Sequence, residues 1–263
     1  GFNPLELNDK SEIPIVTSQV IGVLKKMFAM SWRPRMEHLL RFVLLALLES
    51  PNPTMLGITR MLTDVEFRQW VLSFCNDPIV KQFWNSEFKN WNEFLASESI
   101  APVLNKVGQF VANPALRNIL GQYNSSFNLR EIIDNKKILI VDLSRGKLGE
   151  DNAVILGSLL ITKIQLAAMS RSNIDKDQRT LFNLYVDEFQ NFSTESFASI
   201  LSEARKYGLC LTVANQYISQ IHEKVREAII GNVGTLVSFA LGSTDAEIIA
   251  KYFQPNIPPK EII

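Results

Sequence analysis

Two adjacent carboxylates, Asp187 and Glu188, stand at the end of an apolar run that begins at Leu184. Such a run is typical of a buried strand of a parallel sheet, and ligands bind beyond the carboxyl ends of those strands. An Asp in this place can hold a hydrated Mg²⁺ on a nucleoside triphosphate, and the Glu beside it can polarise the attacking water. The alternative is an ordinary strand end, at which one acid caps the next helix and the other is solvated.

The residues that follow favour the catalytic interpretation. A helix pattern covers residues 193–207 and stops at Gly208, and residues 209–214 have the pattern of a second strand. A strand, a helix and a second strand in this order predict a βαβ unit with a right-handed crossover. The tips of its two strands should then share one edge of the sheet.

Three further polar features end predicted strands. Gln216 follows the second strand and could orient the attacking water or sense a γ-phosphate, although a solvated residue at a helix start is the alternative. Asp142 ends a predicted strand at residues 137–142, and we favour the interpretation that it caps the turn at 144–146. A turn at residues 242–244 ends a predicted strand at 235–241.

Arg205 lies at the end of the helix that follows the carboxylates. A cation at a helix C-terminus is favourable in its own right, which is the simpler interpretation. The alternative is an arginine finger, because a guanidinium is permanently charged and binds phosphate oxygens in a fork. A finger here points away from its own strand tip, so it would serve the ATP of a neighbouring subunit in a ring.

The carboxylate pair has the form of a Walker B motif, but the matching phosphate-binding loop is absent. No Gly-x-x-x-x-Gly-Lys-Ser/Thr occurs in the 263 residues. The sequence therefore predicts part of an ATPase that uses ATP and Mg²⁺, with the loop expected upstream of Gly1. This chain alone is expected to bind ATP poorly and to be inactive.

The composition argues against several classes of protein. Lys plus Arg and Asp plus Glu are both 27, so no global positive field attracts nucleic acid. The two cysteines lie among apolar residues and are expected to be buried free thiols, and no Cys/His spacing suggests zinc. We expect no membrane span, because the apolar stretch at 154–169 carries Lys163, and no signal peptide.

The pattern of apolar residues changes along the chain. Helical spacing dominates residues 12–120, where Pro102 and Pro114 are expected to separate helices, and strands alternate with helices after residue 134. We therefore expect three segments: a residual NTPase segment at 1–11, an all-α domain at 12–120 and an ATPase domain with an open parallel sheet at 121–263.

The stretch from Leu184 to Gln216 resembles the Walker B, arginine-finger and sensor-glutamine region of type IV coupling proteins. These are the TraD/TraG conjugative DNA-transfer ATPases of the HerA/FtsK superfamily. The segments that carry the resemblance are DEFQNF at 187–192, SEARKYG at 202–208 and ANQY at 214–217, with further matches at 32–37, 103–108, 113–118 and 143–149. The resemblance implies a fold of class α/β, a RecA-like P-loop NTPase parallel sheet with an inserted all-α domain.

The resemblance also implies a function: an ATP-driven hexameric DNA translocase for conjugative transfer or type IV secretion. Asp187 would hold Mg²⁺ through water, Glu188 would activate the nucleophile, Gln216 would couple the γ-phosphate state to movement, and Arg205 would complete a neighbour's site. The implied partners are single- or double-stranded DNA, further copies of the chain in a homo-hexamer, and a relaxase or secretion-channel proteins. The implied location is the cytoplasm, at the face of the inner membrane through parts outside this chain.

Three alternatives remain open at the level of sequence. One is a HerA-type translocase or helicase for DNA repair or chromosome handling. Another is a degenerate NTPase-fold scaffold without hydrolysis. The third is a Mg²⁺ phosphohydrolase or nuclease that uses Asp142, Asp187 and Glu188 directly.

Overall fold

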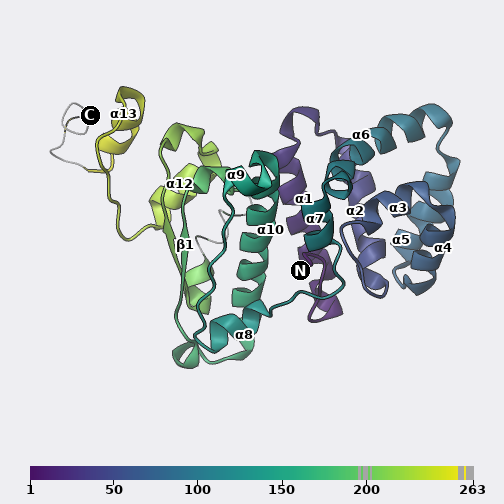
Figure 1. Ribbon diagram of the computed structural model, residues 1–263, viewed down its shortest axis with the longest axis horizontal. Helices are drawn as coiled ribbons and strands as arrows, with labels where there is room; N and C mark the ends of the chain where they lie inside the picture. Colours follow the sequence, from purple (N-terminus) through teal and green to yellow (C-terminus); the bar gives the residue numbers. More distant parts are fainter. Residues whose placement is uncertain (195–196, 198–200, 202, 254–257, 259–263) are drawn as a thin grey trace. The chain divides into compact units, whose positions relative to one another are not determined.

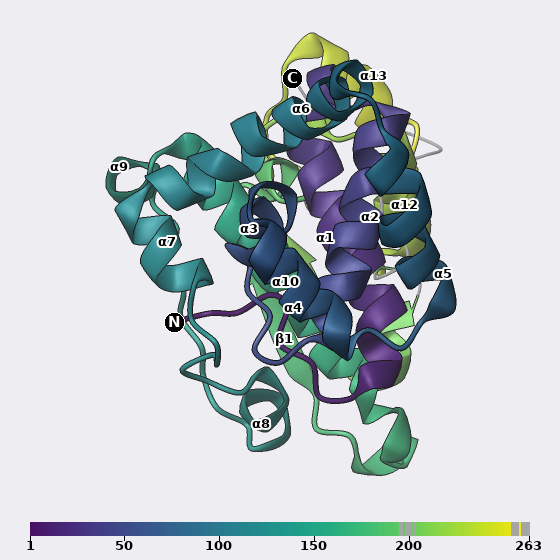
Figure 2. The same cartoon turned by 90° about the vertical axis from the view of Figure 1, so that its right-hand side faces the viewer.

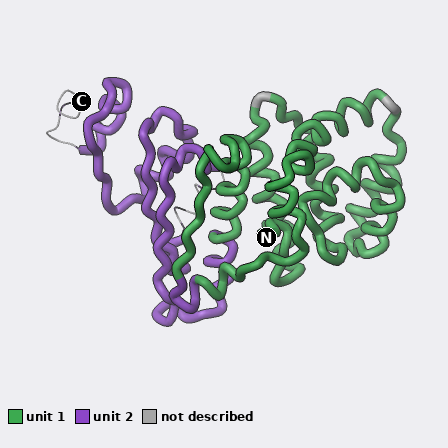
Figure 3. Tube along the Cα trace, viewed as in Figure 1, with its two compact units in different colours: residues 1–132, 138–164 green, residues 133–137, 165–263 purple. Residues whose placement is uncertain are grey.

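The computed structural model describes the chain except for residues 195–196, 198–200, 202, 254–257 and 259–263. Two compact units make up the chain (Figure 3). Unit 1 comprises residues 1–132 and 138–164, and unit 2 comprises residues 133–137 and 165–263.

Unit 1 is built from helices (Figure 1). The α-helices are α1 (Ile13–Met27), α2 (Pro34–Glu49), α3 (Gly57–Thr63), α4 (Val65–Phe74), α5 (Pro78–Gln82), α6 (Glu93–Ala112), α7 (Pro114–Leu120), α8 (Leu129–Asp134), α9 (Arg145–Leu148) and α10 (Glu150–Met169), of which α8 and α10 continue into unit 2. Short 3-10 turns are η1 (Lys10–Glu12), η2 (Ala29–Ser31) and η4 (Phe88–Asn90), and Phe83–Glu87 is one π-helical segment.

The core of unit 1 follows the predicted apolar faces. Helices α1 and α2 lie side by side, and α2 also packs on α3 and α6 (Figure 2). Val20, Val23 and Leu24 of α1 and Leu40 and Leu44 of α2 are all buried. The prediction of helical spacing over residues 12–120 is confirmed within the described residues, where every regular element is a helix.

Local capping signals explain where several helices begin. Asp64 accepts a hydrogen bond from the Phe67 N–H at 2.9 Å, and Asp77 accepts one from the Ile79 N–H at 2.8 Å. Pro114 opens α7 as predicted, because its missing N–H is not needed at the first helical position. The expectation for Pro102 was wrong, since α6 runs through it.

Unit 2 contains a pair of parallel strands, β1 (Phe182–Val186) and β2 (Leu209–Val213). Leu184 pairs with Leu211, and Val186 with Val213. The α-helices α12 (Glu223–Asn232) and α13 (Ser243–Ala250) follow, and the 3-10 turns are η5 (Ser170–Asn173), η6 (Lys176–Gln178), η7 (Phe189–Asn191), η8 (Ala204–Tyr207) and η9 (Ile218–Gln220). The predicted parallel pair is confirmed. Residues 195–196, 198–200 and 202 of the helix expected over 193–207 lie outside the described residues, and its described end, Ala204–Tyr207, is the 3-10 turn η8.

The predicted fold class, an α/β RecA-like parallel sheet with an inserted all-α domain, is wrong. In the described part of the chain the sheet consists of β1 and β2, and the remaining regular structure is helical. The predicted strands 137–142 and 235–241 run as coil (Figure 1). A strand requires a hydrogen-bonded neighbour. Without one, these apolar segments leave side chains in solvent: Ile138 and Ile140 are 88% exposed, and Phe239 is 84% exposed.

The first residues of the chain are held in unit 1. The buried Asn3 side chain donates to the carbonyl oxygens of Pro53 (2.9 Å) and Tyr123 (2.8 Å). The Phe2 N–H donates to the Ile119 carbonyl oxygen. The predicted domain boundaries, with segments at 1–11, 12–120 and 121–263, stay a prediction.

One helix of the described chain meets the length and composition of a membrane span. It covers Glu150–Asn173, although the sequence prediction had excluded a span here. In its most apolar window 78% of the residues are buried, as in the core helix of a folded domain. Lys163 on this helix donates to the Glu6 carbonyl oxygen, and burial lowers the pKa of its ammonium group.

Candidate functional site

The tips of β1 and β2 are joined by hydrogen bonds. The Ala214 N–H donates to the Val186 carbonyl oxygen (3.0 Å), and the Phe189 N–H donates to the Ala214 carbonyl oxygen (2.9 Å). The chain that leaves β1 through Asp187 and Glu188 therefore stays beside the chain that leaves β2 towards Gln216. This is the juxtaposition of strand tips that the sequence predicted.

Glu188 lies at the centre of this edge. Its Oε1 accepts a hydrogen bond from Gln216 Nε2 at 2.6 Å, and its Oε2 accepts one from Gln190 Nε2 at 2.6 Å. Both partners are neutral carboxamides, so each oxygen of the Glu188 carboxylate is held by an uncharged donor. The contact with Gln216 joins two residues that were predicted independently, from different strands.

The backbone of Glu188 is strained. Its φ of 50° and ψ of 42° place it in the left-handed region, which costs a residue with a Cβ about 1 kcal/mol or more. The Glu188 N–H donates to Asp187 Oδ1 at 2.9 Å, so the side chain of Asp187 stabilises this turn. Backbone strain of this kind concentrates at functional sites, where the surrounding contacts maintain it.

The carboxylates at this edge suit one kind of metal site. The described residues contain no group of three or more His, Cys, Asp or Glu side chains that could enclose an ion. Mg²⁺ does not need such a cage, because it keeps several waters and binds one or two carboxylates together with substrate phosphates. The exposed carboxylate of Asp187 fits that mode of binding.

Arg205 is exposed in η8, on the segment that leads into β2. Two other arginines hold the backbone beside it. Arg171 Nη1 donates to the Tyr207 carbonyl oxygen (2.9 Å), and Arg179 donates to that of Lys206. The Arg205 backbone is thus fixed while its side chain faces solvent. The expectation that Arg205 points away from its own strand tip stays a prediction, because residues 195–196, 198–200 and 202 between them lie outside the described residues.

Arg171 is a fully buried cation, with 0% of its side chain exposed. Its Nη2 donates to the Thr180 carbonyl oxygen (2.6 Å), and its Nε pairs with Asp134 Oδ1 (3.1 Å). Gly208 turns tightly around this guanidinium with a φ of 74°, and a Cβ there would lie 3.1 Å from Arg171 Nη1. One side chain therefore connects the ends of α8, η8 and the segment that enters β1.

Asp142 does not follow a strand of the β1–β2 sheet, because residues 137–142 are coil. It lies in unit 1, where it accepts hydrogen bonds from the Ser144 N–H (3.0 Å) and from Lys147 Nζ (2.6 Å). The interpretation as a turn cap is confirmed. Hydrogen bonding by Lys147, then by Ser144, lowers the pKa of Asp142 to about 2.

Substitution of Lys147 by glutamine is expected to raise the pKa of Asp142 towards its ordinary value of 3.8, because the cationic donor is lost. In the native chain the lowered pKa gives stability above pH 3.8 that disappears as the pH falls towards about 2. An NMR titration of the Asp142 carboxyl measures the pKa in both proteins. An identical pKa in the variant would contradict the ion pair.

Two features escaped the sequence prediction. Asp245 is a buried carboxylate whose oxygens accept from the Ile218 and Ser219 N–H groups. Gln190 holds the second oxygen of Glu188. Gln190 carried a usable signal, since a carboxamide two residues beyond the acid lies within reach of it. Asp245 carried none beyond its place directly after the predicted turn at 242–244.

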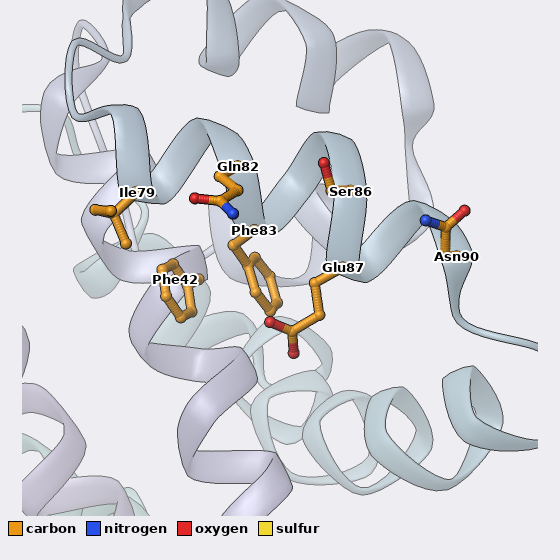
Figure 4. A pocket seen from close by; sticks show the side chains of 7 residues that line it. All are labelled: Phe42, Ile79, Gln82, Phe83, Ser86, Glu87 and Asn90. Carbon is orange, nitrogen blue, oxygen red and sulfur yellow. The ribbon is translucent and has the colours of Figure 1, made fainter.

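Unit 1 contains a cavity of about 530 Å³. Figure 4 shows Ile79, Gln82, Phe83, Ser86 and Glu87 projecting from one helical stretch, with Phe42 opposite and Asn90 at the end. The Phe42 and Phe83 rings stack with centroids 4.1 Å apart. The closely spaced aromatic residues between positions 83 and 91 were the available signal for this cluster.

Comparison with known proteins connects unit 2 to a family. None of the curated proteins or solved structures compared with the chain matches it. Residues 182–253 match the family model described as the TraM recognition site of TraD and TraG. The matched segment contains β1, β2, the Glu188–Gln216 contact, Arg205 and Asp245. Over these residues the chain is similar to TraD and TraG, which supports a relationship to the coupling proteins of conjugation.

Proposed function

We propose that this chain is part of an ATP-driven, hexameric DNA translocase that serves conjugative transfer. The observation that carries the proposal is the hydrogen bond between Glu188 and Gln216, which joins the tips of two parallel strands within the segment similar to TraD and TraG. A relationship to the HerA/FtsK ATPases and a place at the cytoplasmic face of the inner membrane, through parts outside the chain, belong to the same proposal.

The proposed chemistry is the transfer of the γ-phosphoryl group of ATP to water. Glu188 accepts a proton from the attacking water, and the carboxamides of Gln190 and Gln216 hold its two oxygens in place. Asp187 would hold Mg²⁺ through water, and the ion would supply positive charge to the phosphate oxygens. Arg205 acts on the nucleotide of a neighbouring subunit.

Gln216 has a second part in this proposal. Its side chain is a neutral donor and acceptor that contacts Glu188 directly at 2.6 Å. A γ-phosphate beside this edge would compete for the same carboxamide. Gln216 would then change partner between the ATP and ADP states, and residues after β2 would follow that change. Such a change of partner would couple ATP hydrolysis to a movement of the residues after β2.

The experiment that tests the proposal is ATP turnover, with and without DNA, by the full-length protein, in which the proposal places the phosphate-binding loop upstream of Gly1. We expect hydrolysis that rises when DNA is added. Residues 1–263 alone should show negligible turnover, because most phosphate contacts come from that loop. Absence of turnover in a folded full-length protein would contradict the proposal and favour a scaffold.

A partner is also proposed. The matched family description names TraM recognition, and we infer that residues 182–253 bind a TraM-type relaxosome protein. Phe239 and Val237 in this segment are 84% and 71% exposed, so they offer apolar contact area. Exposed apolar residues that lie together are a common feature of binding surfaces.

Substitution of Phe239 by serine is expected to weaken binding to the TraM-type protein of the same transfer system by about tenfold or more, because truncation of a large apolar contact at the centre of an interface commonly costs this much. The matched control is Ile138→Ser, because Ile138 is 88% exposed but lies outside the matched segment. Isothermal titration calorimetry measures both affinities. Equal losses in the two variants, or none in either, would contradict this surface.

A further inference from the structure

Asp245 connects α13 to the segment that carries Gln216. The carboxylate is 4% exposed, and it accepts hydrogen bonds from the Ile218 N–H (Oδ2, 3.0 Å) and the Ser219 N–H (Oδ1, 3.2 Å). These two donors open the turn η9, just after Gln216. A buried charge is tolerated when it is hydrogen-bonded in this way, and bonds to an ionised acceptor are stronger than neutral ones.

Asp245 does more than favour its own helix. An acid in the first turn of a helix is stabilising because of the helix dipole. However, both oxygens of Asp245 bond to η9, and the N-cap of α13 is Gly242, which has no side chain for capping. The carboxylate therefore joins α13 to η9, whose residues Ile218 and Ser219 lie 27 and 26 positions before Asp245 in the sequence.

Gln216 lies in a short stretch that is held at both ends. On one side, Ala214 is hydrogen-bonded to β1 through Val186 and to Phe189. On the other side, the Ile218 and Ser219 amides are bound by Asp245. Few backbone conformations satisfy both ends, so the placement of the Gln216 side chain against Glu188 depends on the second anchor as well as the first.

We propose that Asp245 is a positioning residue that holds Gln216 against Glu188, so that the position of α13 controls the pair at the strand tips. The catalytic half of this inference rests on the proposed ATPase function. The structural half concerns only contacts within unit 2. Anything that displaces α13, such as a partner bound to this segment, would release Gln216 from Glu188.

The first test uses residues 1–263 without nucleotide. In Asp245→Asn, which removes the charge with little change of shape, the Ile218 and Ser219 amides should exchange hydrogen about tenfold faster or more, because bonds to a charged acceptor are lost. The side-chain amide signals of Gln216 should move towards those of a solvent-exposed glutamine. The amide of Phe182, which donates to the Gly208 carbonyl oxygen away from this turn, should stay protected and reports that the variant is folded. The control is Glu247→Gln, because Glu247 is exposed on the same helix.

The second test uses the full-length protein. Asp245→Asn should lower kcat for ATP hydrolysis while KM for ATP changes little, because phosphate binding does not involve this carboxylate. Unchanged exchange at residues 218 and 219, or faster exchange with an unchanged kcat, would overturn the inference. If the wild-type protein shows no turnover, the proposed function fails, and the exchange and Gln216 signals alone decide whether Asp245 positions Gln216.

Discussion

Full-length protein carrying Arg205→Ala is expected to lose ATP turnover by about a thousandfold or more, the contribution usual for an arginine finger. Arg205 is exposed, while its neighbours Lys206 and Tyr207 have their carbonyl oxygens held by Arg179 and Arg171. A fixed backbone with a solvent-facing guanidinium suits a residue that acts on another subunit. Steady-state ATP hydrolysis with DNA present measures the loss.

The matched control for this prediction is Lys206→Ala. Lys206 is an exposed cation beside Arg205, and its backbone rather than its side chain makes the contact with Arg179. Turnover of the control should change little. Mixing Arg205→Ala with Glu188→Gln subunits should restore activity, because some junctions then pair an intact Glu188 with an intact Arg205. No recovery at any ratio, in hexamers shown to mix, would count against action in trans.

Substitution of Arg171 by methionine is expected to destabilise unit 2 by about 3–5 kcal/mol, the usual result of removing one partner from a buried ion pair. Asp134 would lose its cation, and the carbonyl oxygens of Thr180 and Tyr207 would lose their donors. Arg171→Lys should recover only part of this loss, because a compact ammonium cannot reach three acceptors in a fork.

The measurement for Arg171 must report on unit 2. All four tryptophans, at positions 32, 70, 84 and 91, lie in unit 1, so their fluorescence does not follow unit 2. Cys210 lies in β2, and the rate at which its thiol is labelled in increasing urea reports the opening of this unit. The control is Arg35→Met, since the ion pair of Arg35 with Glu98 is exposed and worth less than about 1 kcal/mol. Equal stability of Arg171→Met and wild type would contradict a stabilising role for the contacts of Arg171 with Asp134, Thr180 and Tyr207.

Periodicity in the sequence predicted the elements whose partners are close along the chain. The apolar faces of α1 and α2 and the parallel pair β1–β2 follow from local spacing, because each pattern is set within a few residues. The contact between Glu188 and Gln216 followed from them, since parallel strands end at one edge. The roles assigned to these side chains stay predictions.

The sequence did not show which of the apolar segments pair with another segment to form a sheet. Residues 137–142 and 235–241 have strand-like composition, but pairing depends on another segment and not on their own pattern. Pro102 was misjudged for a related reason. Proline inside a helix costs about 3 kcal/mol, and α6 continues because Val103, Val107 and Phe110 bury their side chains beyond it.

The geometry of the site also contains features with no local signal. The left-handed backbone of Glu188 is maintained by contacts on both sides of it, and no glycine marks it in the sequence. The Asp245 contact joins residues 26 and 27 positions apart, which periodicity cannot detect. The backbone conformation of Glu188 and the contact of Asp245 with η9 together fix how the side chains lie at the ends of β1 and β2.

The measurement that tests the central claim most directly compares Glu188→Gln with Glu247→Gln in the full-length protein, recording bound ATP and DNA-dependent turnover in the same sample. Glutamine keeps the shape of Glu188 but cannot accept a proton from water, so turnover should fall about a hundredfold or more while bound ATP is unchanged. The exposed Glu247 should tolerate its substitution. Turnover equal to wild type in Glu188→Gln would contradict the account and make Glu188 a structural residue of the strand edge.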